Sequence, residues 1–180
     1  MIKKNTKIES ISEEFWPIID YNYEQIRFAE IKASVIISFY SLLLTVGYTL
    51  NILDSENIYN ISVNSIEDSV KYIFLIPAII FSVISLRRCV QCYLPRLNFT
   101  TEKSPFFFGD YPVHYRDFNS FEKTINKIID NEPEYRRHLS QIVFATGHIA
   151  AKKFFFVNKG IISLIRSIAF IILFGVFSYF

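Results

Sequence analysis

Three long apolar stretches, at residues 33–53, 72–86 and 160–180, constrain this chain more than any other feature of its sequence. The first has 21 residues and no charge, and at about 1.5 Å per residue such a helix crosses the ~30 Å core of a bilayer. The second is shorter, but Lys71 and Arg87 at its ends can extend their charged groups toward the headgroups. These stretches predict three transmembrane helices. The alternative for each is a helix buried in a protein core.

Composition supports the membrane interpretation. Hydrophobic residues make up 51% of the 180 residues, with 19 Phe and 11 Tyr, which is too apolar for an ordinary soluble domain. The net charge of +2 predicts no partner by itself, so the distribution of charge along the chain has to be considered.

The basic residues lie almost entirely on one side of the predicted spans. Residues 1–32 hold five Lys or Arg and residues 87–159 hold twelve, whereas residues 54–70 hold none. The positive-inside rule therefore predicts a cytoplasmic N-terminal helix at 1–32, spans at 33–53, 71–87 and 160–180, a short external loop at 54–70, a cytoplasmic helical sensor region at 88–159 and an external C-terminus.

The regions outside the spans are predicted to be helical. Pro17 is suited to the first turn of a helix that runs without Gly or Pro into the first span. A second long helix is expected from Glu134 into the last span, with Asp130 and Asn131 as caps, and a shorter one at 119–130. The predicted fold class is an all-α membrane protein, in which long helices extend from three transmembrane segments into a small cytoplasmic helical domain.

Cys89 and Cys92 form a Cys-x-x-Cys pair that could indicate metal, redox or packing roles. A structural zinc site needs four ligands, and the three histidines are scattered along the chain. A thioredoxin-like pair would start a helix after a strand, whereas this pair follows a predicted span. We therefore expect the cysteines to pack on one helix face, and we expect no metal and no cofactor.

Hydroxyl side chains in the first span follow a spacing of three to four residues, and the set is Ser38, Ser41, Thr45 and Thr49. Such a stripe faces a pore or a neighbouring helix, in the same subunit or another. Arg166 adds a charge inside the last span. Because three helices cannot enclose a water-filled path, we predict a homo-oligomer, with a tetramer favoured.

No catalytic motif is present: the chain has no Gly-rich phosphate loop and no Gly-x-Ser-x-Gly, so we expect a protein that is not an enzyme. Basic and aromatic residues are abundant instead, and these side chains pair with phosphates and stack on bases. The basic residues predicted to contact a nucleotide are Arg87, Arg88, Arg96, Lys103, Lys152 and Lys153. The alternative is that they flank the membrane near anionic lipids.

Three stretches in order, "RFAEIKAS", "ISLRRCVQCYLPRL" with "PFFFGDY", and "HLSQIVFATGHIAAKKFFFVNKG", resemble the Pycsar transmembrane effector family. Glu30 stands where the family pattern has aspartate. The resemblance implies an antiphage effector of the bacterial inner membrane, controlled by a cyclic nucleotide or oligonucleotide from a partner cyclase or nucleotidyltransferase, which arrests or kills the infected cell. It also singles out Arg96, Gln141 and Lys153 as ligand contacts.

A second function class stays open from the residues alone. The chain could be a structural membrane protein or a small transporter subunit without a soluble nucleotide ligand. A transporter needs polar groups at mid-membrane, and the predicted spans offer mainly hydroxyls and Arg166.

Overall fold

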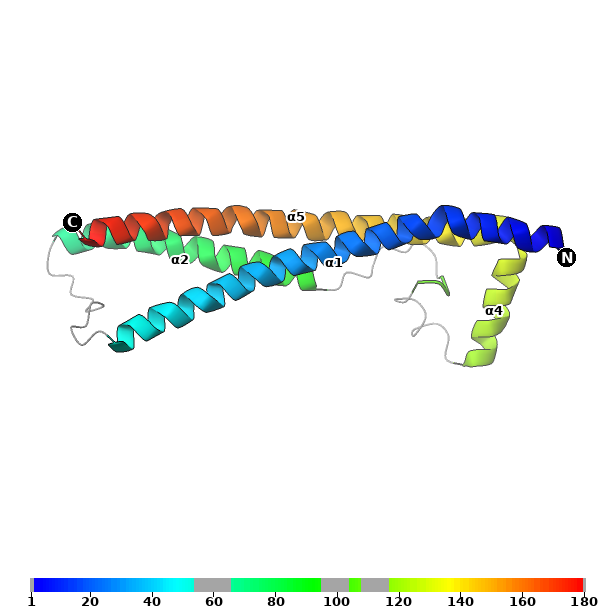
Figure 1. Ribbon diagram of the computed structural model, residues 1–180, viewed down its shortest axis with the longest axis horizontal. Coiled ribbons are helices and arrows are strands. Elements are labelled where there is room, and N and C mark those ends of the chain that lie inside the picture. The colour runs from blue at the N-terminus through cyan, green and yellow to red at the C-terminus, as the bar shows by residue number, and fades with distance from the viewer. Residues whose placement is uncertain (1, 54–65, 95–103, 108–116, 180) are drawn as a thin grey trace. The chain divides into compact units, whose positions relative to one another are not determined.

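The computed structural model describes residues 2–53, 66–94, 104–107 and 117–179 (Figure 1). Its helices are α1 (Ile2–Leu53), α2 (Ile66–Tyr93), α4 (Phe118–Asp130) and α5 (Glu132–Tyr179), and the described residues contain no strand. α1, α2 and α5 are long and apolar enough to cross a membrane. The predicted all-α membrane fold with three spanning helices is therefore confirmed.

The predicted start of the first helix is wrong. α1 begins at Ile2, so Pro17 lies inside it rather than in its first turn. Proline cannot donate a backbone hydrogen bond, which weakens a helix interior. Ile11 and Ile19, on either side of Pro17, are both fully buried in one cluster. This packing on both sides of the proline offsets the missing bond and keeps the helix continuous.

The junction between α4 and α5 agrees with the sequence. The Asp117 carboxylate accepts a 2.9 Å hydrogen bond from the Ser120 N–H and caps α4, and this bond lowers the pKa of Asp117. The Asn131 carbonyl accepts a 2.9 Å bond from the Tyr135 N–H, and its side-chain amide donates to the Glu134 carboxylate at 3.0 Å. Asn131, one of the two predicted capping positions, lies directly before α5 and is also the C-cap of α4, whereas Asp130 is the last residue of α4.

The chain divides into two compact units. The head unit consists of Met1–Phe28 and Pro95–Lys152, and the membrane unit consists of Ala29–Leu94 and Lys153–Phe180. The membrane unit contains the three apolar stretches. Both α1 and α5 contribute residues to each unit.

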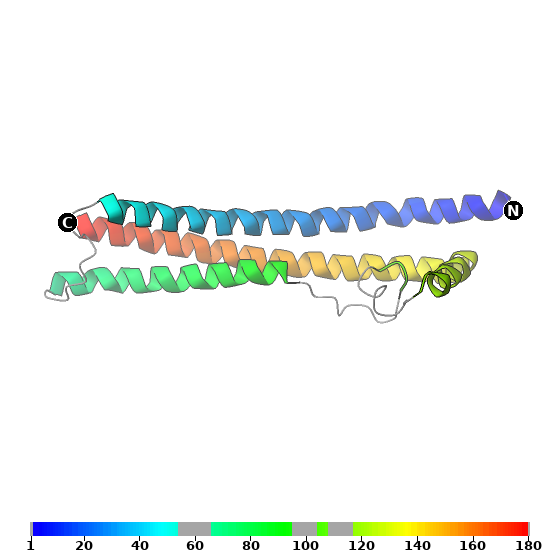
Figure 2. The ribbon, with the colours of Figure 1, turned by 90° about the horizontal axis from the view of Figure 1, so that it is seen from below.

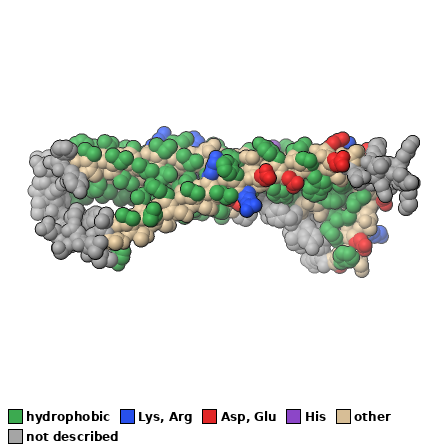
Figure 3. Space-filling model, viewed as in Figure 1, with side chains coloured by type: hydrophobic (Ala, Val, Ile, Leu, Met, Phe, Trp, Pro, Cys, Tyr) green, Lys and Arg blue, Asp and Glu red, His purple; other side chains and the backbone are tan. Residues whose placement is uncertain are grey.

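The head unit has a core of large side chains. Its buried cluster comprises Ile11, Ile19, Ile128, Tyr135, Leu139 and Ile142. Polar contacts join α1 to α5 beside it: the hydroxyls of Ser12 and Tyr135 are 3.1 Å apart, and the Asn22 amide donates to Thr146 at 3.0 Å. The later residue of α1 contacts the later residue of α5, so the two helices run parallel here. Figure 3 shows carboxylates gathered over this unit.

In the membrane unit, α2 and α5 are antiparallel and lie side by side (Figures 1 and 2). The Ser85 hydroxyl donates to the Gly160 carbonyl at 2.8 Å, and the hydroxyls of Ser82 and Ser167 are 2.6 Å apart. A Cβ atom at Gly160 would lie 3.1 Å from the sulfur of Cys89. Glycine therefore permits the close approach of these two helices.

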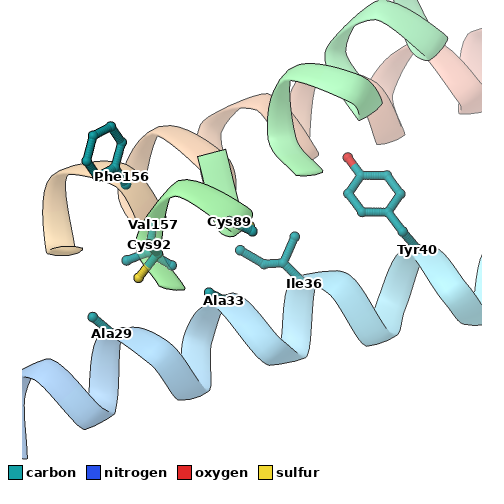
Figure 4. Packing of buried hydrophobic residues seen from close by; sticks show 8 residues of the cluster. All are labelled: Ala29, Ala33, Ile36, Tyr40, Cys89, Cys92, Phe156 and Val157. Carbon is teal, nitrogen blue, oxygen red and sulfur yellow. The ribbon is translucent and has the colours of Figure 1, made fainter. Parts of the chain in front are cut away.

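α1 packs against this pair with one face only. Ala29, Ala33, Ile36 and Tyr40 recur at helical spacing and are buried with Cys89, Cys92, Phe156 and Val157 (Figure 4). Both cysteines are fully buried, which confirms their packing role. Beyond Tyr40 the side chains of α1 are mostly exposed, and its end diverges from α2 and α5 in Figure 1. Apolar side chains dominate the surface of this unit in Figure 3.

Candidate functional site

A set of polar contacts in the membrane unit centres on Lys153. Its ammonium group donates to the Glu30 carboxylate at 2.5 Å and to the Cys92 carbonyl at 2.7 Å. Glu30 comes from α1, Cys92 from α2 and Lys153 from α5. One side chain therefore ties together all three spanning helices.

Tyr93 and Ser34 extend this contact. The Tyr93 hydroxyl donates to the Glu30 backbone carbonyl at 2.9 Å, and the hydroxyls of Ser34 and Tyr93 are hydrogen bonded to each other. We call the set Glu30, Ser34, Cys92, Tyr93 and Lys153 the charged node. Because the Cys92 carbonyl lies in the last turn of α2, Lys153 also satisfies one of the acceptors that a helix end leaves open.

The charged node is partly shielded from solvent. The Lys153 side chain is 12% exposed and that of Glu30 is 37% exposed. In such surroundings an ion pair is stronger than in water, and removing one partner leaves the other charge poorly solvated. Separating the two charges without a replacement is therefore unfavourable. An anion that reaches Lys153 can take the place of the Glu30 carboxylate.

The predicted ligand contacts fall into both units. Arg87, Arg88 and Lys153 belong to the membrane unit, and Gln141 and Lys152 belong to the head unit. Arg87 is exposed, whereas Arg88 is half-buried and donates to Gln91 at 3.1 Å. Gln141 and Lys152 are half-buried on α5.

Two further predicted contacts, Arg96 and Lys103, lie outside the described residues. Whether the seven ligand contacts form one site stays a prediction.

The hydroxyl stripe of α1 is exposed in the single chain. This holds for all four residues, Ser38, Ser41, Thr45 and Thr49. The last three donate to the carbonyl four residues earlier, at 3.1, 2.9 and 2.9 Å, so their donors are satisfied within α1. Arg166 is also exposed, with its guanidinium 5.7 Å from the centre of the Phe81 ring. A pore or packing role for these residues stays a prediction.

Metal-ligating side chains do not cluster in the described part of the chain: no three of His, Cys, Asp or Glu gather there. Cys89 and Cys92 are free thiols in the packed cluster. His138 is buried in the head unit, where its Nδ1 lies 3.1 Å from the Ser104 hydroxyl.

Sequence reasoning found Lys153 but missed its partners. In the sequence Glu30 stands out only as a variation in a motif, and nothing singles out Tyr93 among the abundant aromatic residues. An acidic residue three positions before a long uncharged stretch is a usable signal, because a carboxylate so close to a bilayer needs a cation. No sequence pattern predicts that Lys153 donates to the backbone carbonyl of Cys92.

The three stretches that meet at the charged node are also those that carried the family resemblance. A model of the Pycsar effector protein domain matches residues 14–180. The chain belongs to this Pycsar effector family. Family membership makes it a membrane effector of antiphage defence that is regulated by a cyclic nucleotide from a partner cyclase. No curated protein and no solved structure matches the chain.

Proposed function

We propose that this Pycsar effector is a gated membrane protein whose resting state is held by the charged node. A nucleotide made by the partner cyclase binds and loosens the node. The oligomer then opens a channel or disrupts the inner membrane, and the infected cell stops growing or dies. The N-terminus is cytoplasmic and the C-terminus periplasmic, as the distribution of basic residues predicts.

The observation that carries this proposal is the double contact of Lys153 with Glu30 and the end of α2. A phosphate that approaches Lys153 competes with the Glu30 carboxylate for the same ammonium group. Once the Glu30 carboxylate is released, α1 keeps its apolar face against α2 and α5 and the hydrogen bonds of Tyr93, but it loses its ion pair to α5. Loss of the ion pair therefore favours a tilt of α1 relative to the other two helices.

The proposed ligand is a cyclic nucleotide or oligonucleotide. Its phosphates are bound by the predicted basic contacts Arg87, Arg88, Arg96, Lys103, Lys152 and Lys153, with Gln141 as a polar contact to the base or sugar. Each hydrogen bond from a cation to phosphate contributes about 1.5–3 kcal/mol.

The proposed assembly is a homo-oligomer, and a tetramer is favoured. The exposure of the hydroxyl stripe on the part of α1 that diverges from α2 and α5 supports this. A second subunit could cover that stripe or face it across a water-filled path.

Two substitutions test the charged node, Glu30→Gln and Lys153→Met, with Lys123→Met on α4 as the control for lost charge. We expect both node variants to be toxic in cells that lack the cyclase, because the resting state is destabilised. Nucleotide affinity, measured by calorimetry on purified protein, should fall about tenfold or more in Lys153→Met and Arg96→Ala. It should be maintained in Glu30→Gln, which leaves the lysine available.

The proposal fails if both node variants insert normally, stay silent without the nucleotide and respond to it as the wild type does. Such a result would make the node a structural contact. Unchanged nucleotide affinity in Lys153→Met and Arg96→Ala would separately exclude those residues as ligand contacts.

A further inference from the structure

Three consecutive phenylalanines on α5 each hold a cation against their ring. The Lys32 ammonium lies 5.3 Å from the centre of the Phe154 ring, and the Lys159 ammonium lies 5.8 Å from that of Phe155. The Arg88 guanidinium lies 6.0 Å from the centre of the Phe156 ring. These are cation–π distances. We call Lys32, Arg88 and Lys159 the cationic collar.

The collar draws on every spanning helix. Lys32 is on α1, Arg88 on α2 and Lys159 on α5, and all three belong to the membrane unit. Successive residues of an α-helix point about 100° apart, so three consecutive rings face three different directions around α5. The cations are therefore spread around the unit at about one level along α5, instead of converging on one point.

This level coincides with the ends of the uncharged stretches. Lys32 directly precedes the stretch at 33–53, and Lys159 directly precedes the stretch at 160–180. Arg88 follows the stretch at 72–86, together with Arg87. Three helices thus place a cation at the same kind of boundary, where an apolar segment leaves the hydrocarbon core and meets the headgroups.

We infer that the cationic collar binds the phosphate groups of anionic phospholipids at one membrane surface. The exposed ring of Phe155 provides apolar surface at the bilayer boundary. The half-buried Phe154 and the buried Phe156 anchor Lys32 and Arg88 to the packed helices, and together the three rings orient the cations at headgroup level. A layer of lipid headgroups surrounds the protein and can reach cations on several sides at once. One soluble phosphate can reach only cations that converge, so the spread of the collar favours the lipid surface.

The test uses the full-length protein in nanodiscs of phosphatidylcholine with or without phosphatidylglycerol. The collar variant is Lys32→Gln/Arg88→Gln/Lys159→Gln. The control is Lys123→Gln/Lys127→Gln/Arg137→Gln, which removes the same charge from exposed positions of the head unit. Native mass spectrometry counts the lipids retained by each protein. We expect wild type and control to prefer phosphatidylglycerol, and the collar variant to lose that preference about tenfold or more.

The inference is overturned if the collar variant retains phosphatidylglycerol as the wild type does. It is also overturned if inorganic phosphate displaces the lipid from the wild type, because the collar would then be a soluble-phosphate site. Should the triple variant not reconstitute, Lys159→Gln alone, at an exposed position, should lose part of the preference, and an unchanged preference would overturn the inference as well. Arg88 is shared with the proposed nucleotide contacts, whereas Lys32 and Lys159 are not. Failure of one proposal can be distinguished from failure of the other, because nucleotide binding can be measured in detergent without anionic lipid.

Discussion

The head unit and the membrane unit of this effector differ in the side chains at which their own helices meet. The head unit buries large ones, with Leu139 and Ile19 fully inaccessible. The membrane unit also buries Ile36, Tyr40 and Phe156, but α2 and α5 approach each other at small residues. Ser85 donates to the Gly160 carbonyl, and a Cβ atom at Gly160 would lie 3.1 Å from the Cys89 sulfur. The same two helices, α1 and α5, contribute to both kinds of packing.

The surrounding solvent explains the difference. In water, burying a large apolar side chain contributes about 1.5–3 kcal/mol, so large residues give the most stability for each position. In lipid, an apolar side chain gains little by leaving the hydrocarbon, and helices associate by close packing and hydrogen bonding. Small residues permit both, which is why Ser85 can reach the carbonyl of Gly160 on the facing helix.

The largest expected effect follows from the head-unit core. Leu139→Ala removes a fully buried side chain and should lower the free energy of unfolding by about 2–5 kcal/mol. Ile18→Ala is the control, because Ile18 lies in the same unit but is 48% exposed. The stability of both variants is measured by thermal denaturation, and hydrogen exchange of the head-unit amides shows whether the loss arises in that unit. Equal losses at the two positions would show that burial does not govern stability in this unit.

A smaller loss is expected where the membrane helices approach each other. Gly160→Leu places atoms within 3.1 Å of the Cys89 sulfur and should cost about 1–3 kcal/mol, because α2 and α5 must separate. Gly175→Leu is the matched control on the same helix, since a Cβ atom there meets nothing within 4 Å. We expect a lower denaturation midpoint in detergent for the first variant only. If Gly175→Leu is equally damaging, close approach at Gly160 is not what stabilises the pair.

Much of the helical framework could be predicted because it depends on local sequence. Gaps in charge identified the three spans, and the Asn131 cap identified the start of α5. The start of α1 could not be predicted from Pro17. Ile11 and Ile19 pack in a cluster with residues that are far away in the sequence, and this packing overrides the preference of proline for a first turn. α2 also extends past Arg87 to Tyr93, since a helix can continue beyond the charge that marks a membrane boundary.

The candidate site was less predictable because its contacts are long-range. Lys153 and Glu30 are 123 positions apart, and the third partner is a backbone carbonyl. The sequence identified Lys153 as basic and placed it in a motif, which favoured a phosphate contact. Only the three-dimensional arrangement shows that this lysine is already paired.

Buried hydroxyls give the smallest and sharpest test of the comparison between the units. In the head unit the Tyr135 hydroxyl bonds to Ser12 at 3.1 Å, so Tyr135→Phe should cost about 0.5–1.5 kcal/mol. In the membrane unit the Tyr40 hydroxyl is buried without a hydrogen-bond partner among the described residues. Removing it should cost nothing or stabilise the protein slightly, because no bond is lost and an unfavourable burial is relieved. The two Tyr→Phe variants delete the same atom, so their denaturation midpoints in one detergent can be compared directly. A loss at Tyr40 equal to that at Tyr135 would contradict this expectation. It would support a hydrogen-bond partner for the Tyr40 hydroxyl from a second copy of the chain, as in the homo-oligomer proposed above, and would direct the search for that interface to this side of α1.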